Sequence, residues 1–77
     1  MNTNQFLDEF ADVALAPREQ VSLDTPLESL EMWDSMAQVS AIAMIDEKLG
    51  AQLPTGSLGA CKTVGDIIKL VKDRLTD

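Results

Sequence analysis

The sequence contains no histidine and only one cysteine, Cys61, among its 77 residues. Without histidine, the chain lacks the usual base for a serine or cysteine nucleophile and the commonest zinc ligand. A single cysteine cannot form an internal disulfide, and nothing near Cys61 in sequence would lower its pKa, so we expect a small buried apolar residue. These absences argue against a hydrolase, a metal site and, since only scattered carboxylates remain, against an enzyme.

Basic residues and long apolar runs are also scarce. Six lysines and arginines are outnumbered by thirteen acidic residues, which gives a formal net charge of −7. Such a charge repels nucleic acid and anionic membranes, so neither is expected as a partner. No stretch approaches the roughly eighteen apolar residues of a membrane span, and the N-terminus lacks the pattern of a signal peptide. We therefore expect a cytoplasmic protein.

The residues that are present favour one folded domain over 1–77. A chain of this length closes a single apolar core. Hydrophobic residues make up 45% of the sequence and charged residues 25%, which is typical of a globular protein rather than of an acidic disordered tail.

Three segments show the spacing of helices, and no strand pattern competes with them. The apolar face of the first ends before Pro17 and comprises Phe6, Leu7, Phe10, Val13 and Ala14. Asp34 suits the N-cap of a second helix over 35–49, which Gly50 can end in a left-handed conformation. Thr63 and Asp66 resemble a capping box before a third long helix. Its apolar face comprises Val64, Ile67, Ile68, Val71 and Leu75.

The segments between these helices are predicted to be ordered loops. Residues 17–34 contain two prolines and show no lasting periodicity, so we expect a long loop. Unanchored loops of this length are uncommon, so apolar residues should pin it to the core: Val21, Leu23, Leu27, Leu30 and Trp33. One short helical turn is expected near 57–61. The fold class is therefore a small all-α bundle.

The second helix has two apolar stripes where a bundle core needs one. Its core stripe comprises Ala41, Ile42, Ile45 and Leu49. An outer stripe, formed by Met36, Val39 and Ala43, lies roughly 140° away at 100° per residue. Either the outer stripe packs against the long loop, or it is an exposed surface for partners that Asp46 and Glu47 orient electrostatically.

Negative charge is concentrated toward the start of this helix. Residues 1–34 carry eight acidic groups and one basic group, whereas residues 62–77 carry three acidic and four basic groups. A basic partner would be steered to the end of the helix near Ser35, although solubility alone also explains individual acidic residues.

The order of local patterns resembles that of acyl carrier proteins. The segment 30–36, Leu-Glu-Met-Trp-Asp-Ser-Met, resembles the family's modification site, in which an Asp-Ser pair opens a helix. Thr25-Pro26-Leu27 precede it, and Ile45 and Leu49 lie within the following helix. Leu53-Pro54 and then Thr63-Val64-Gly65-Asp66-Ile67 follow in the family's order. The resemblance therefore spans nearly the whole chain.

This resemblance implies a four-helix bundle of three long helices and one short one, with a long loop between the first two. It implies that a phosphopantetheinyl transferase converts Ser35, using coenzyme A, into a 4′-phosphopantetheine ester whose thiol holds acyl or aminoacyl groups as thioesters. Asp34 and Met36 flank the serine in this modification site, and Asp34 would help to present it. Such a carrier acts as a monomer, is not a catalyst, and delivers cargo to ligases, synthases and transferases.

Family members dock through the second helix, and the matching positions here are Met36, Val39, Ala43, Asp46 and Glu47. Other positions depart from carriers of fatty acid synthesis. The second helix is less acidic here, because it contains Gln38, Ser40, Ala41 and Lys48. Just before the Asp-Ser pair, Trp33 replaces a small residue, and just after it Met36 replaces leucine. These departures favour a specialised polyketide, nonribosomal peptide or other acyl pathway. Trp33 would anchor the loop in the core or line the entrance to an acyl-binding interior.

One alternative from another functional class is left open. An unmodified helical interaction module would use the same outer stripe to bind a protein, and Ser35 would then be only a helix-opening residue.

Overall fold

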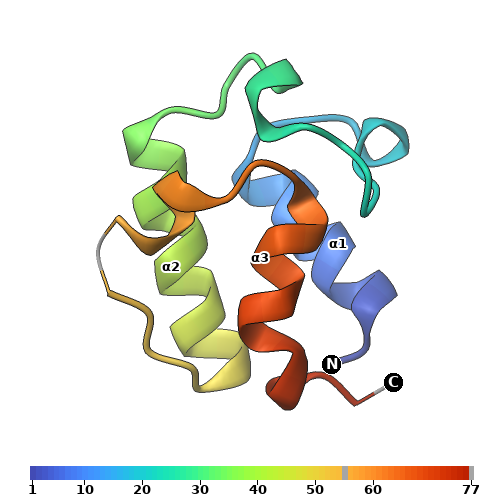
Figure 1. Cartoon of the computed structure of the whole chain (residues 1–77). Coiled ribbons are helices and arrows are strands. Elements are labelled where there is room, and N and C mark those ends of the chain that lie inside the picture. Colours follow the sequence, from blue (N-terminus) through green and yellow to red (C-terminus); the bar gives the residue numbers. More distant parts are fainter. Residues whose placement is uncertain (55, 77) are drawn as a thin grey trace.

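The computed structural model describes residues 1–54 and 56–76. Three α-helices pack around one core: α1 (Thr3–Val13), α2 (Ser35–Leu49) and α3 (Val64–Val71) (Figure 1). Four 3₁₀ turns complete the described elements: η1 (Arg18–Gln20), η2 (Leu27–Ser29), η3 (Ser57–Ala60) and η4 (Lys72–Arg74). In these residues the nearest approach to a sheet is an isolated bridge between Pro26 and Thr63. The all-α prediction is confirmed.

Two details of the predicted bundle differ from the structure. The short fourth helix is the 3₁₀ turn η3, because Gly56 precedes it in a left-handed conformation and Cys61 follows it in an extended one. Four residues between such ends cannot build the repeated hydrogen bonds of an α-helix. The third helix is also shorter than predicted, since α3 ends at Val71 and the chain tightens into η4 before Leu75.

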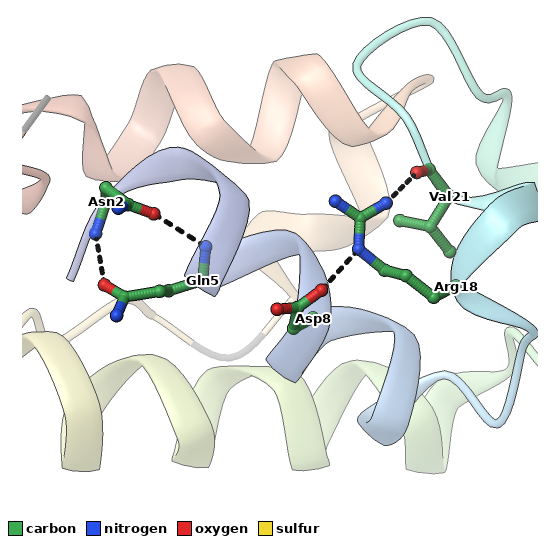
Figure 2. Close-up of polar contacts among 5 residues, drawn as sticks. All are labelled: Asn2, Gln5, Asp8, Arg18 and Val21. Atoms are coloured by element: carbon green, nitrogen blue, oxygen red, sulfur yellow. Dashed lines mark hydrogen bonds and ion pairs between the residues drawn. The ribbon is translucent and has the colours of Figure 1, made fainter.

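Local polar contacts fix the start of α1 and the turn that follows it. Asn2 and Gln5 form a capping box, in which each side chain accepts the other residue's backbone N–H at 2.8 and 2.9 Å (Figure 2). Arg18 Nε donates to Asp8 Oδ1 at 2.6 Å, and its Nη1 donates to the Val21 carbonyl at 2.9 Å. The ion pair is partly exposed, so its main effect is to orient the chain after α1.

The core lies where the three helices meet. The largest fully buried side chains come from every helix, the long loop and η3: Phe6, Phe10, Ile45, Leu58, Ile67, Val21, Val64 and Val71. Of the face predicted for the first helix, Val13 alone is only partly buried. The first helix was therefore correctly placed, although it ends four residues before Pro17.

The faces of α2 distinguish between the two hypotheses for its outer stripe. Ala41, Ile45 and Leu49 are buried as predicted, but Ile42 is only half-buried. Ala37 and Met44, which were not assigned to the core, take part in the buried face. The outer stripe is exposed, with Met36 at 77% and Val39 at 58%. Of the two alternatives, packing of the outer stripe against the loop is therefore wrong, and an exposed surface is confirmed.

The long loop is pinned by four of its five predicted anchors. Val21, Leu27 and Leu30 are buried, and Trp33 is half-buried against the core. Leu23 was predicted as an anchor, but its side chain is 48% exposed. At this position the backbone holds the loop instead, since the Leu23 carbonyl accepts the Gly65 N–H at 2.9 Å.

Backbone hydrogen bonds join the loop to the start of α3. Leu27 N–H donates to the Lys62 carbonyl at 2.8 Å, and Val64 N–H donates to the Thr25 carbonyl at 3.0 Å. At Gly65 the two backbones leave no room for a side chain, because a Cβ added there would lie 2.8 Å from the Leu23 carbonyl oxygen. Glycine is therefore required at this position by the approach of two backbone segments.

Gly65→Ala should destabilise the protein by about 1–3 kcal/mol, because the loop must move away from α3 to admit the methyl group. Gly59→Ala is the matched control, since a Cβ there would meet Gln38 Oε1 at an ordinary 3.6 Å. Urea denaturation of both variants measures the difference. Equal stability of the two variants would show that the loop does not constrain residue 65.

The capping box predicted for the third helix is present. Thr63 Oγ1 accepts the Asp66 N–H at 3.2 Å, and Asp66 Oδ2 accepts the N–H groups of Thr63 and Lys62 at 3.2 and 3.0 Å. The Lys62 and Thr63 backbone donors, in that order, lower the pKa of the Asp66 carboxyl. A lowered folded-state pKa means that the carboxylate stabilises the fold above the unfolded pKa of about 4, and that this stability is lost below it.

The melting temperature should therefore fall as the pH decreases below about 4, and Asp66→Asn should remove part of this dependence. Near neutral pH the variant should melt below the wild type, with the gap narrowing toward pH 2. Asp73→Asn, at an exposed position in η4, is the control. Melting curves of Asp66→Asn and the wild type that are parallel between pH 2 and 7 would contradict this role for Asp66.

Candidate functional site

Ser35 is the first residue of the fifteen-residue helix α2, and it is exposed. The preceding residue, Asp34, has extended backbone angles and caps the helix. Its Oδ1 atom accepts the Ala37 N–H at 2.9 Å, and its carbonyl accepts the Gln38 N–H at 3.0 Å. The predicted N-cap is confirmed, and the cap fixes Ser35 at the point where the helix begins.

The start of α2 favours a bound anion. The first N–H groups of an α-helix have no carbonyl partner within the helix, and they point along the positive end of its dipole. A phosphate joined to a side chain at this position therefore meets donors and a favourable field. The Asp34 side chain accepts the N–H of Ala37, the third residue of the helix. Ser35 itself is exposed to solvent.

Leu30 and Trp33 hold the segment before Ser35 in place. Leu30 is buried, and the Trp33 ring lies 5.2 Å from the Phe10 ring, centroid to centroid, with a 44° tilt. Such a tilted contact between aromatic rings is favourable in addition to the area it buries. Trp33, two residues before the serine, thus packs against the buried Phe10 of α1, as the anchoring hypothesis predicted. Met32, between the two anchors, is 50% exposed.

A hollow of about 630 Å³ lies beside the first turns of α2. Its walls come from the loop, α2, η3 and the segment before α3, and include Trp33, Gln38, Leu58, Cys61 and Lys62. Trp33 therefore lines this space as well as anchoring the loop. Apart from the suggested place of Trp33 at an entrance, the walls of this hollow could not be predicted from the sequence, because they come from segments that are far apart in the chain.

Cys61 is a half-buried thiol in this wall rather than a fully buried core residue. Burial, followed by the nearby charge of Asp66, raises the pKa of the thiol. A raised pKa keeps the sulfur protonated, so it is a poor nucleophile near neutral pH. The expectation that no neighbour would activate Cys61 is therefore consistent with its surroundings.

The residues predicted to dock partners occupy one exposed face of α2. At 100° per residue, they fall within an arc of about 100°, and Ser35 lies at its edge. All five are exposed: Met36, Val39, Ala43, Asp46 and Glu47. One departure used to infer a diluted acidic surface does not apply, because Ala41 is fully buried and belongs to the core.

Two other kinds of site are absent from the described residues. No helix in this part of the chain is both long and apolar enough to cross a membrane. No group of three or more histidine, cysteine, aspartate or glutamate residues is arranged there to hold a metal ion. The structural features that remain are the capped serine, the exposed face of α2 and the adjacent hollow.

Asp34→Ala should destabilise the protein by about 1 kcal/mol, because the Ala37 N–H loses its acceptor and the first turn of α2 frays. Asp34→Asn retains an oxygen that can accept this hydrogen bond, so its loss should be smaller. Chemical denaturation measures both changes. Equal losses in the two variants would indicate that charge, rather than the cap, explains the role of Asp34.

The chain matches a protein-family model. The family model described as "Phosphopantetheine attachment site" matches residues 4–71, which include all of α2, η3 and α3 and all of α1 except its first residue. No curated protein and no solved structure matches the chain significantly.

Proposed function

Because the chain belongs to the phosphopantetheine-attachment family, we propose that it is an acyl carrier protein whose 4′-phosphopantetheine is attached to Ser35. Domains of this family carry that group covalently and are not themselves catalysts. The observation that carries the assignment of the residue is the position of Ser35. It is an exposed hydroxyl at the head of a capped, fifteen-residue helix.

The residues around Ser35 fit the phosphodiester. The helix start supplies N–H donors and the positive end of a dipole. The Asp34 carboxylate is directed to the Ala37 N–H at 2.9 Å, and this hydrogen bond partly offsets its repulsion of a phosphate. When attached, the group supplies a terminal thiol that holds an acyl or aminoacyl cargo. The protein's own contribution is to hold the attachment point still while leaving it accessible.

Activation of the Ser35 hydroxyl must come from the partner enzyme. The chain contains no histidine, and its one thiol has a raised pKa. A phosphopantetheinyl transferase would therefore supply both the base and coenzyme A. The carrier supplies a docked substrate, and tethering raises the effective concentration of cargo at each partner to the order of millimolar.

The outer face of α2 supports docking of the loading and processing enzymes. Met36 and Val39 present apolar surface, and Asp46 and Glu47 add negative charge farther along the helix. Methionine adapts to differently shaped partners, which suits a carrier that visits several enzymes. Gln38, Ser40 and Lys48 make this helix less acidic than those of fatty acid synthesis, so we propose a specialised polyketide, nonribosomal peptide or related pathway.

The exposed stripe also supports the alternative, an unmodified interaction module, and a single experiment separates the two. The apo protein is incubated with coenzyme A and a promiscuous phosphopantetheinyl transferase, and its intact mass is measured. We expect a gain of one phosphopantetheine unit, which Ser35→Ala abolishes.

Ser40→Ala is the matched control, because Ser40 is a second exposed serine on α2. This variant should be modified like the wild type. Circular dichroism confirms that each variant is folded. A folded wild type that gains no mass would favour the interaction module, and modification of Ser35→Ala would place the group elsewhere.

A further inference from the structure

Leu15 ends α1 in a conformation that normally calls for glycine. Its φ is +55°, and among the described residues it is the one non-glycine with a positive φ. The Ala16 N–H donates to the Ala11 carbonyl at 3.0 Å, and the Leu15 N–H donates to the Asp12 carbonyl at 3.3 Å. These two bonds form a Schellman motif with Leu15 at the left-handed position. A side chain in this conformation is strained, because its Cβ crowds the following carbonyl.

Packing does not offset this strain. Leu15 is 69% exposed and belongs neither to the buried core nor to the partly buried residues packed against it. Glycine at this position would relieve the strain without removing a core contact. Leu15 therefore lowers stability through its backbone, and burial of its side chain does not offset this cost. A strained residue that gains nothing from packing is a candidate for a role in binding.

Leu15 borders a second hollow, of about 420 Å³, where α1 meets the end of the long loop. Met32, which is 50% exposed, also lines this hollow, and Glu31 is the one charged residue in the lining. The nearest basic residue along the chain, Arg18, is already paired with Asp8 and the Val21 carbonyl. The hollow thus combines two exposed apolar side chains with an unneutralised negative charge.

This hollow lies close to Ser35. The helices α1 and α2 run in opposite directions, so the end of α1 and the start of α2 share one end of the bundle (Figure 1). Met32 is three residues before Ser35, so their Cα atoms are at most about 11 Å apart. A protein that buries about 800 Å² of the carrier covers a disc of about 16 Å radius, which reaches from Ser35 to this hollow.

We infer that Leu15, Met32 and Glu31 form a second docking patch, which the phosphopantetheinyl transferase occupies with an apolar side chain beside a lysine or arginine. This inference rests on the proposed function, because the transferase must cover the Ser35 end of the bundle. The apolar side chain fits between Leu15 and Met32, and the cation pairs with Glu31. The patch adds to the outer face of α2 and lies on different elements.

The test is steady-state kinetics of modification, with coenzyme A, a promiscuous transferase and the apo chain as the varied substrate. Leu15→Gly should raise the KM by about three- to tenfold through lost apolar burial, with kcat unchanged. Its melting temperature should be equal to or above that of the wild type, because glycine relieves the strain. Met32→Gln should raise the KM similarly. This second variant still tests the patch if Leu15→Gly does not fold.

The charge contribution is tested with Glu31→Gln, whose effect on KM should be largest at low salt and shrink as salt rises. Leu70→Ala is the control, since Leu70 is an exposed leucine on α3, and its KM should match the wild type. Wild-type KM values for Leu15→Gly and Met32→Gln would overturn the patch while leaving the modification of Ser35 intact. Failure to modify the wild type would overturn both proposals.

Discussion

The fixed start of α2 determines where Ser35 lies. The Asp34 carboxylate holds the Ala37 N–H, and two residues before Ser35 the Trp33 ring packs against Phe10 of α1. The cap decides where the helix begins, and the aromatic contact decides where that beginning lies relative to the core. A serine one position earlier would lie in extended chain, and one a turn later would lie along the side of the helix. Along α2, the accessible hydroxyl and the helix's anion-binding end coincide at Ser35.

The exposed face of α2 follows from how the long loop is held. Between Leu23 and Leu27 the loop pairs with residues 62–65, and Gly65 admits the backbone contact that a side chain would block. The loop is thus hydrogen-bonded to the start of α3, and it leaves the outer stripe of α2 uncovered. Met36 and Val39 are exposed because the backbone that could have covered them is hydrogen-bonded elsewhere. The same arrangement opens the hollow beside Trp33 and Gln38.

Features encoded by a few neighbouring residues could be predicted from the sequence. The caps at Asp34 and Thr63 and the left-handed Gly50 are local chemistry, so both ends of α2 and the start of α3 were correctly placed. The position of Ser35 at a helix start followed directly. Features that depend on distant segments were missed. Leu23 looks like a core residue in sequence, yet its backbone rather than its side chain makes the contact.

The missed parts of the candidate site share this origin. Neither hollow could be found from periodicity, because each is bounded by segments that only the tertiary fold brings together. The left-handed Leu15 was hidden because glycine is the usual signal for that conformation. The shorter α3 and the 3₁₀ form of η3 likewise reflect how the chain closes around the core rather than local preference.

Peptide mapping by mass spectrometry, after treatment with coenzyme A and a transferase, directly identifies the serine that carries phosphopantetheine. The chain has five serines, so the modified residue can be located without ambiguity once the peptides are fragmented. We expect phosphopantetheine on the peptide fragment that contains Ser35 and on no other fragment. Its presence at Ser22, Ser29, Ser40 or Ser57, or its absence from a folded chain, would contradict the account.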